Sequence, residues 1–320
     1  MGTRKVIVAD AKFKDYEIER RILAPHDAAV EVHHCTSADE LVEATPDADA
    51  LLVHALKIGA SALARLPRCR GIVRYGVGYD VIDIEAARAL GIPVSNVPDY
   101  CTDEVADHTL AMVLALGRRL TKVDAQLRAG RWEGTPFRPI HALASRTLGL
   151  LGIGRIGAAV VARAKPFGFR IVAHDPQAAP AVFETQGVEA VTFDELLDAS
   201  DILSLHLPLT PGTRHVIDAA AIARMKSGSS LVNVSRGGLI DEEAAAAALR
   251  SGHLSGVALD VFEREPLTPD HPLLSVSGAI LTSHCAWYSE EAFDQLQRLA
   301  AEELARHLTG EPGRNVVNAA

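Results

Sequence analysis

The sequence lacks the cysteine and histidine patterns that mark disulfide frameworks and metal sites. Its four cysteines, Cys35, Cys69, Cys101 and Cys285, are far apart in a chain of 320 residues and form no CxxC motif. Such spacing is typical of reduced thiols in an intracellular protein. The thirteen histidines are scattered too, without an HxxxH or HExxH motif. We therefore expect no metal site.

The chain also lacks an excess of positive charge and a long apolar run near its start. Its net charge is −9, which argues against nucleic acid or an anionic membrane as a partner. The N-terminal sequence MGTRKVIVADAKFKDYE holds one four-residue apolar run with charges on both sides. That run is too short for a secretory signal or a bilayer span. We expect a cytoplasmic protein that acts on a small molecule.

The chain is organised around the stretch from Thr147 to Asp175, TLGLLGIGRIGAAVVARAKPFGFRIVAHD. A short apolar run breaks into the turn GIGRIG, which continues into an alanine- and valine-rich helix and then a second strand that ends in an acid. Glycines at this spacing allow a tight turn, and they let a pyrophosphate contact the N–H groups at the helix N-terminus. The pattern predicts dinucleotide binding by Gly152, Gly154, Arg155 and Ile156.

Asp175 bears on the choice of nucleotide, because an acid at this position can accept hydrogen bonds from both ribose hydroxyls of an adenosine. A carboxylate here would repel a 2′-phosphate, and neither arginine nor lysine occurs in residues 176–179. The expected cofactor is therefore NAD rather than NADP. A protonated His174 would offset part of this repulsion.

Short apolar runs alternate with amphipathic stretches along the whole chain. Strands are expected at residues 6–9, 29–32, 50–53, 71–74 and 93–94, and again at 202–207, 231–234, 257–261 and 280–282. Residues 132–145 are rich in Gly, Pro and Ser and read as a surface loop. Alternating strands and helices predict parallel sheets, and 320 residues exceed the usual size of one core. We expect an α/β protein of two domains.

Three polar residues, Arg236, Glu265 and His284, each follow a predicted strand in the second half of the chain. Ligands of parallel sheets bind beyond the carboxyl ends of the strands, so we expect these side chains beside the nicotinamide. Hydride transfer from a secondary alcohol needs a base, suited to His284, and a cation for the oxygen and any carboxylate, suited to Arg236. Glu265 would fix the imidazole tautomer. Each residue alone could instead be a surface or packing residue.

Two turns in the first half of the chain also follow predicted strands. One carries His54, and the other reads RYGVGYD from Arg74 onward. The small residues Gly76, Val77 and Gly78 leave backbone N–H groups free for an anion. A plain strand-to-helix turn explains this stretch equally well.

Six segments together resemble the D-isomer-specific 2-hydroxyacid dehydrogenase family: RYGVGYDVID, VPDYCTDEVADHTL, GIGRIG, NVSRGGLID, LDVFEREPL and SHCAWYSEE. They extend over the chain from about residue 50 to 318. Within the family, the chain is most similar to the C-terminal-binding-protein-like branch, through HCAWYS around His284 and through His54.

The resemblance implies an NAD-dependent oxidoreductase that interconverts a 2-oxo acid and its D-2-hydroxy acid. It implies Arg236 as binder of the substrate carboxylate and keto oxygen, His284 as acid and base, and Glu265 as its partner. The substrate residues would be His54, Arg74, Val77, Gly78 and Trp287. The cofactor residues would be Val77, Val105, Gly152, Gly154, Arg155, Ile156, Asp175, Leu207, Pro208, Thr213, Val234, Asp260 and His284, with Asp260 holding the nicotinamide carboxamide.

The resemblance also implies two Rossmann-like or flavodoxin-like domains, the nucleotide-binding one inserted into the substrate-binding one. Residues 1–98 and 288–320 would form the substrate domain, residues 99–287 the NAD domain, and the segment from Thr102 onward a homodimer interface.

Several alternatives stay open. A dimeric NAD(H)-sensing binding protein of corepressor type is one, although the chain lacks the long tail of animal corepressors. Phosphite dehydrogenases share the same Arg, Glu and His, and 3-phosphoglycerate dehydrogenase activity also fits.

Val81 stands where the branch often has Asn, so the substrate pocket is expected to differ. The side chain of the substrate and the physiological direction are not determined, although Trp287, Tyr75 and His54 suggest an aromatic-walled pocket.

Overall fold

The structure, a computed structural model, describes residues 3–133, 135 and 137–319. The chain forms two compact units, each with its own sheet and core. Unit 1 comprises Met1–Cys101 and Ser289–Ala320, and unit 2 comprises Thr102–Tyr288. No helix within the described residues is both long and apolar enough to cross a lipid bilayer.

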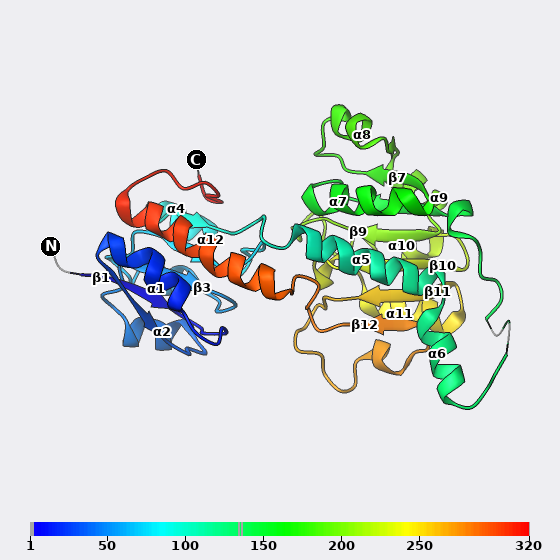
Figure 1. Cartoon of the computed structure of the whole chain (residues 1–320), viewed down its shortest axis with the longest axis horizontal. Coiled ribbons are helices and arrows are strands. Elements are labelled where there is room, and N and C mark those ends of the chain that lie inside the picture. The colour runs from blue at the N-terminus through cyan, green and yellow to red at the C-terminus, as the bar shows by residue number, and fades with distance from the viewer. Residues whose placement is uncertain (1–2, 134, 136, 320) are drawn as a thin grey trace. The chain divides into compact units, whose positions relative to one another are not determined.

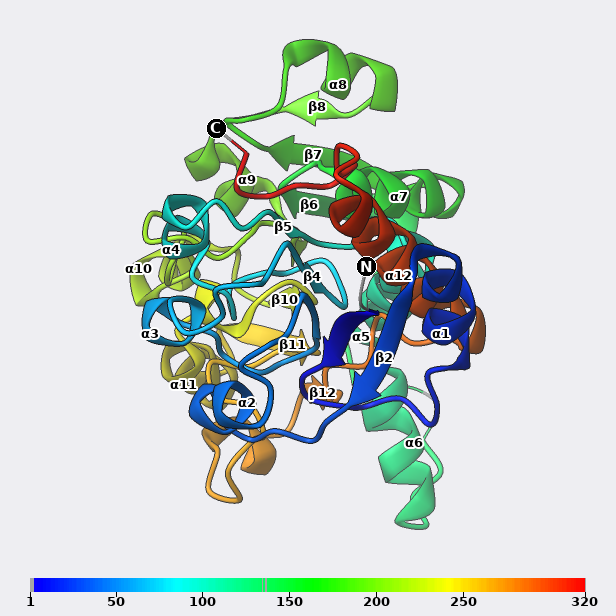
Figure 2. The ribbon, with the colours of Figure 1, turned by 90° about the vertical axis from the view of Figure 1, so that its left-hand side faces the viewer.

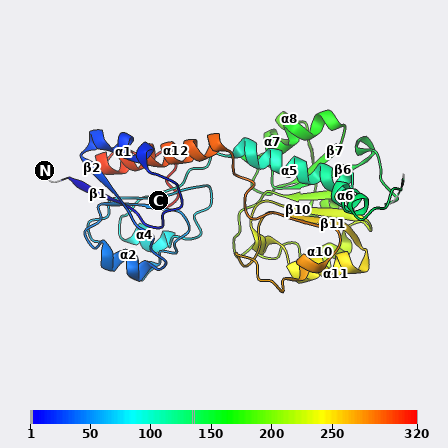
Figure 3. The ribbon, with the colours of Figure 1, turned by 60° about the horizontal axis from the view of Figure 1, so that its bottom comes forward.

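Unit 1 is built on a five-stranded parallel sheet in the order β2-β1-β3-β4-β5. This is the flavodoxin-like strand order, in which the direction of winding reverses between β1 and β3. The strands are β1 (Arg4–Val8), β2 (Ala28–Val32), β3 (Ala50–Val53), β4 (Ile72–Arg74) and β5 (Val94–Ser95). Strand β3, in the middle of the sheet, is buried along its whole length, because helices cover both faces of the sheet (Figure 3).

The helices of unit 1 form two layers around this sheet (Figure 2). Helix α12 lies beside α1 on one face, while α2, α3 and α4 cover the other. Their bounds are α1 (Glu17–Leu23), a 3₁₀ turn at Ala24–His26, α2 (Ala38–Ala44), α3 (Ala60–Leu63), α4 (Ile84–Ala89) and α12 (Glu290–Thr309). The C-terminal segment then returns to β5, where the Asn318 side chain accepts a hydrogen bond from Val94 N and donates one to Ile92 O, each at 2.8 Å.

Unit 2 contains a seven-stranded parallel sheet in the order β12-β11-β10-β9-β6-β7-β8. Six of these strands follow the Rossmann order, with the reversal between β6 and β9, and β12 extends one edge. The strands are β6 (Thr147–Leu151), β7 (Arg170–His174), β8 (Glu189–Ala190), β9 (Ile202–Leu205), β10 (Ser229–Asn233), β11 (Leu254–Leu259) and β12 (Ala279–Leu281). Strand β6 is buried along its whole length and leads straight into the glycine-rich turn.

Helices cover both faces of this sheet, with α5 and α7 on one side and α10 and α11 on the other (Figure 3). The bounds are α5 (Thr102–Gly117), α6 (Leu120–Arg128), α7 (Arg155–Ala164), α8 (Pro180–Gln186), α9 (Phe193–Ala199), α10 (Ala219–Arg224) and α11 (Glu242–Ser251), with 3₁₀ turns at Leu143–Ser145, Lys165–Phe167, Gly237–Leu239 and Pro272–Ser275. Side chains accept hydrogen bonds from the first-turn amides of six helices in the two units, and such caps fix where a helix begins. They are Ser37, Asp83, Thr192, Asp218, Asp241 and Ser289.

The predicted fold class, an α/β protein with two parallel Rossmann-like or flavodoxin-like sheets, is confirmed (Figure 1). Some predicted limits are wrong by a few residues: β10 begins at Ser229 rather than 231, β11 at Leu254 rather than 257, and β9 ends at Leu205 rather than 207. Ser229, Ser230, Ser255 and Gly256 interrupt the apolar pattern at the starts of β10 and β11, and the packing of these positions against neighbouring strands cannot be read from propensity. At β9 the apolar Leu207 makes the predicted strand too long. Positions 134 and 136 of the expected loop 132–145 lie outside the described residues.

Candidate active site

The glycine-rich turn lies between β6 and α7, and its glycines serve different purposes. Gly152 has φ +98°, and a β-carbon there would lie 2.5 Å from the carbonyl oxygen of His206, so only glycine fits. A β-carbon at Gly157 would lie 2.5 Å from Gly152 O, which keeps the helix close to the turn. A β-carbon at Gly154 would meet nothing within 4 Å. Open space therefore lies beside the backbone where α7 begins, as a bound pyrophosphate requires.

Asp175 follows β7 and already holds the glycine-rich turn. Its Oδ2 accepts a hydrogen bond from Ile153 N at 2.9 Å, and its Oδ1 accepts one from Gln177 N at 3.0 Å. A carboxylate oxygen has two lone pairs, so each can accept a further hydrogen bond from a ribose hydroxyl. The residues of the turn and Asp175 together fit the adenosine end of a dinucleotide.

His284 and Glu265 form a hydrogen-bonded pair in unit 2. His284 Nδ1 lies 2.7 Å from Glu265 Oε2, and Glu265 Oε1 accepts a second hydrogen bond from Phe262 N at 2.9 Å. Because a carboxylate accepts the Nδ1 proton, Nε2 is the imidazole atom left to exchange a proton with a ligand. Nε2 makes no hydrogen bond to another described residue, and 41% of the side chain is exposed. This geometry leaves Nε2 able to accept or donate a proton.

The charge state of Glu265 supports this use. Burial alone would raise its pKa, but the hydrogen bonds from His284 and Phe262 N and the positive charges of His284 and Arg236 outweigh burial, so the pKa lies below its ordinary value of 4.5. The carboxylate is thus ionised near neutral pH and can stabilise a protonated imidazole.

Arg236 follows β10 and is held by a tight local network. Asn233, which is 1% exposed, donates from Nδ2 to Arg236 O at 2.8 Å and accepts from Ser235 N at 3.0 Å. A β-carbon at Gly237 would lie 1.8 Å from the backbone of Phe262, so the Arg236 turn lies directly against the segment that leads to Glu265. Arg236 therefore lies near enough to Glu265 for its positive charge to lower the pKa of that carboxyl group, although burial acts in the opposite direction.

The backbone of His284 has φ +55°, an uncommon conformation for a residue other than glycine. Asp260, after β11, stabilises it: its carbonyl oxygen accepts from His284 N at 2.8 Å, and its carboxylate accepts from Cys285 N and Ala286 N, each at 2.9 Å. Sequence reasoning did not find this bracing role, because it depends on contacts 24 to 26 residues apart. Asp260 keeps room on Oδ2 for the predicted bond to a carboxamide.

The other predicted cofactor residues of unit 2 lie at or near the ends of strands and helices. Thr213 Oγ1 donates to Pro208 O at 2.8 Å and so closes the loop after β9 that contains Leu207. Val234 and Val105 are 8% and 6% exposed, so each offers only a small apolar surface. Trp287 is half-buried, and its Nε1 donates to His284 O at 2.8 Å.

Within unit 1, a buried acid that sequence reasoning missed organises the turn that carries His54. Asp10 follows β1, is 7% exposed, and accepts hydrogen bonds from His54 N, Ala55 N and Leu56 N at 2.7, 2.6 and 2.8 Å. The sequence signal for this role was an acidic residue directly after the first predicted strand. Because Asp10 occupies these three amides, an anionic substrate cannot bind them.

The second turn of unit 1 follows β4. Gly76 has φ +126°, and a β-carbon there would lie 1.7 Å from Arg74 Nη1, so the guanidinium of Arg74 folds over this turn. Asn96 Nδ2 donates a hydrogen bond to Val77 O at 2.6 Å, which holds the turn in place. The guanidinium of Arg74 therefore lies against the turn that contains Val77 and Gly78.

Tyr75 does not line a pocket, so the expectation of its aromatic wall is wrong. It is 1% exposed, and its hydroxyl donates to Glu19 Oε1 at 2.7 Å inside the core of unit 1. Side chains of successive strand residues point to opposite faces, so when Arg74 faces the turn, Tyr75 faces the core.

The chain is similar to several known dehydrogenases. Residues 110–286 match the family model described as D-isomer specific 2-hydroxyacid dehydrogenase, NAD binding domain. D-3-phosphoglycerate dehydrogenase of Mycobacterium leprae is 42% identical over 280 residues, which are 87% of this chain and 53% of that protein. Glyoxylate reductase of Korarchaeum cryptofilum is 40% identical over 283 residues, 87% of this chain and 85% of that protein.

Among solved structures, D-lactate dehydrogenase from Aquifex aeolicus, complexed with NAD and lactic acid, matches with a TM-score of 0.88 and 26% identity over 99% of this chain and 100% of that one. The chain spans about half the length of the phosphoglycerate dehydrogenases that it matches. These comparisons do not single out the C-terminal-binding-protein-like branch, which stays a prediction.

Proposed function

Because the chain belongs to the D-isomer specific 2-hydroxyacid dehydrogenase family, we propose that it is an NAD-dependent oxidoreductase that interconverts a 2-oxo acid and the corresponding D-2-hydroxy acid. The observation that carries the proposal is the His284–Glu265 pair, in which Nδ1 lies 2.7 Å from Oε2. The positive charge of Arg236 is among the causes that lower the pKa of Glu265. A base and a cation beside each other are what the oxidation of a 2-hydroxy acid needs.

In the direction of oxidation, His284 Nε2 accepts the proton of the substrate hydroxyl as the C–H bond at the same carbon breaks. The glycine-rich turn and Asp175 would hold NAD, which would supply the hydride acceptor for oxidation and, in its reduced form, the hydride donor for reduction. Arg236 binds the carboxylate and the oxygen that becomes the carbonyl, and Glu265 stabilises the imidazolium until the proton leaves. In reduction, His284 donates this proton to the new hydroxyl.

We assign the cofactor to unit 2. The glycine-rich turn and Asp175 support NAD at the adenosine end, and Leu207, Pro208, Thr213 and Val234 would complete its surroundings. His54, Arg74, Val77 and Gly78 would contact the substrate, together with Trp287. The N–H groups around Gly76 and the Arg74 guanidinium suit an anionic group.

A second candidate within the family is oxidation of 3-phosphoglycerate. The 42% identity to a D-3-phosphoglycerate dehydrogenase favours it, and Arg74 could bind a phosphate as well as a carboxylate. In a panel, 3-phosphohydroxypyruvate would then be reduced faster than glyoxylate or pyruvate.

The test is a panel of 2-oxo acids assayed with NADH by absorbance: glyoxylate, pyruvate, hydroxypyruvate, 3-phosphohydroxypyruvate and a bulky aromatic 2-oxo acid. At least one should be reduced, and Arg236→Ala and His284→Ala should each lower kcat/KM by about 10²-fold or more, the usual contribution of a positioned acid or base. Arg250→Ala, on the exposed last turn of α11, is the matched control and should keep full activity.

Full activity in the Arg236 and His284 variants would refute the assignment. No turnover across the panel, combined with tight NADH binding, would favour the alternative of a nucleotide-sensing binding protein.

We also propose that the protein is a homodimer through α6 and the segment after it. Leu120, Leu127 and Trp132 are 55%, 51% and 87% exposed, a concentration of apolar side chains that supports an interface. Leu127→Glu should shift the protein from dimer to monomer in light scattering. A wild-type monomer at the same concentration would contradict the proposal.

The cytoplasm is the compartment that we propose. All four cysteines are free thiols in the structure, namely Cys35, Cys69, Cys101 and Cys285. A reducing compartment favours free thiols, which supports this proposal. Alkylation of the freshly isolated protein without reductant should modify four thiols after denaturation, and fewer would contradict it.

A further inference from the structure

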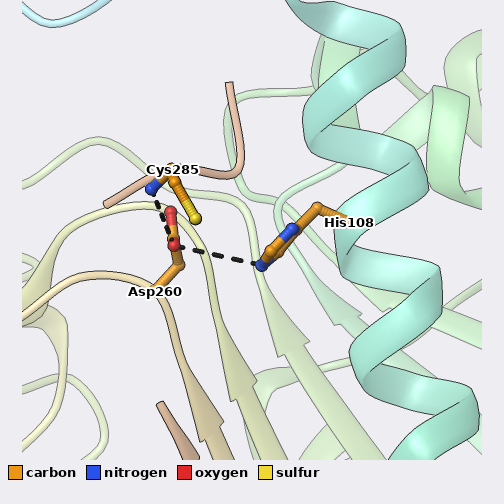
Figure 4. Close-up of side chains that lie close together, drawn as sticks. All are labelled: His108, Asp260 and Cys285. Atoms are coloured by element: carbon orange, nitrogen blue, oxygen red, sulfur yellow. Dashed lines mark hydrogen bonds and ion pairs between the residues drawn. The ribbon is translucent and has the colours of Figure 1, made fainter. Parts of the chain in front are cut away.

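Three side chains of unit 2 that could bind a metal ion lie together, although they come from separate parts of the chain. They are His108 on α5, Asp260 after β11 and Cys285 after β12 (Figure 4). One ligand atom from each, an imidazole nitrogen, a carboxylate oxygen and a thiol sulfur, lies within 4.8 Å of the other two. No sequence motif predicts this cluster, so it goes against the expectation of no metal site.

The charge at the cluster favours a cation. Asp260 is 1% exposed, and among the described residues no lysine or arginine forms an ion pair with it. Its carboxylate is held by Thr282 Oγ1 at 2.5 Å and by two backbone N–H groups, while His108 Nε2 lies 3.9 Å from Oδ1. A buried carboxylate without a full positive charge beside it is costly, and a bound cation would remove that cost.

The kinds of ligand atom indicate which cation. An imidazole, a thiolate and a carboxylate are the donors that Zn²⁺ takes in proteins, usually in tetrahedral geometry. Mg²⁺ and Ca²⁺ prefer oxygen ligands alone. Three protein ligands leave a fourth position, which water can fill.

We propose that His108, Asp260 and Cys285 bind a thiophilic divalent cation such as Zn²⁺, and that this ion and the nicotinamide of NAD(H) exclude one another. The second half rests on the proposed function, in which Asp260 holds the nicotinamide carboxamide. The ion would replace the 3.2 Å contact between His108 Nε2 and Thr282 Oγ1 and would engage Asp260 in its place. Because it would exclude the nicotinamide, the bound ion would inhibit the enzyme.

The first experiment measures binding of Zn²⁺ to the nucleotide-free protein by competition with a chromophoric chelator. One ion per chain should bind, and Cys285→Ser and His108→Gln should each weaken binding by at least about tenfold, since losing even an outer partner of a metal site costs that much. Cys35→Ser, at a buried thiol outside the cluster, and His34→Gln, at an exposed histidine, are the matched controls and should bind as the wild type does. With Co²⁺, a thiolate-to-metal charge-transfer band should appear in the wild type and vanish in Cys285→Ser.

The second experiment titrates NADH in the presence and absence of Zn²⁺, with the bound nucleotide followed by fluorescence. Zn²⁺ should raise the apparent Kd of NADH in the wild type and leave it unchanged in Cys285→Ser. Equal Zn²⁺ affinity in the wild type, Cys285→Ser and His108→Gln would overturn the site. Cysteine-dependent Zn²⁺ binding with an unchanged NADH affinity would overturn the mutual exclusion.

The metal site and the proposed function fail separately. A protein that reduces no 2-oxo acid but binds Zn²⁺ through Cys285 would refute the proposed function and keep the metal site. A protein that reduces a 2-oxo acid without Cys285-dependent Zn²⁺ binding would do the opposite.

Discussion

Gly154→Ala separates the fold of the glycine-rich turn from its use as a nucleotide site. The residue has φ −67°, in the extended region, and a β-carbon there would meet nothing within 4 Å. Alanine can therefore occupy the position. Because alanine lowers the conformational entropy of the unfolded chain, it offsets any small strain in the folded state, and the free energy of unfolding should change by no more than about 1 kcal/mol.

The same methyl group would occupy the space in which we place the pyrophosphate of NAD. Crowding a packed contact by one methyl costs about 1–3 kcal/mol. NADH binding should therefore weaken by roughly 5- to 150-fold, because 1.4 kcal/mol corresponds to about tenfold in Kd.

The assay is NADH binding by fluorescence titration, with urea unfolding of the same samples. Gly152→Ala is the contrasting variant: φ +98° and the 2.5 Å approach to His206 O should cost at least about 2 kcal/mol of stability. A stable Gly154→Ala protein that binds NADH as tightly as the wild type would refute the placement of the pyrophosphate.

Three further predictions concern buried or charged groups. Asp10→Ala should lower the free energy of unfolding by about 3 kcal/mol or more, because it leaves three amide N–H groups of the turn at residues 54–56 without an acceptor. Asp175→Ala should reduce the preference for NADH over NADPH in kcat/KM by about tenfold, since it removes the repulsion of a 2′-phosphate. Burial lowers the pKa of His206 to about 4 from its ordinary 6.5, so below pH 6.5 the unfolded chain binds more protons than the folded one. The free energy of unfolding should therefore fall as the pH drops from 6.5 towards 4, by about 3 kcal/mol at most.

Each of these predictions has its own control. Asp10→Asn keeps an acceptor oxygen and should lose less stability than Asp10→Ala; equal losses would contradict the hydrogen-bond argument. A wild-type enzyme that prefers NADPH would contradict the role of Asp175. His206→Gln should show a shallower loss of unfolding free energy between pH 6.5 and 4 than the wild type, and identical curves would contradict the assignment to His206.

The sequence was enough to predict the parts of the site that depend on local pattern. The turn GIGRIG, with apolar strands on both sides and Asp175 at the end of the second, predicted a strand-turn-helix unit that the structure contains as β6, α7 and β7. Arg236 and His284 could be singled out because each follows a strand of a parallel sheet, and the carboxyl ends of such strands share an edge.

What the sequence could not show depends on contacts between distant residues. Asp10 holds the amide of His54, 44 residues away, and no periodicity reports such a bond. The cluster of His108, Asp260 and Cys285 combines one helix and two strand ends. Tyr75 was misplaced because an aromatic residue in a glycine-rich turn suggests a pocket, whereas strand alternation directs it into the core.

Short edge elements were missed for another reason. Helix α8 and strand β8 have seven and two residues, and β8 is exposed along both. Segments this short carry too little apolar periodicity to be recognised. Strand β8 is held by pairing with β7 rather than by burial.

The most direct measurement of the proposed chemistry uses NADH that carries deuterium at the transferable position of the nicotinamide. With the preferred 2-oxo acid, the product should carry one deuterium on C2 and have the D configuration, and His284→Ala should form it at a much lower rate. A product without deuterium on C2, or with the L configuration, would contradict direct hydride transfer by a D-specific enzyme.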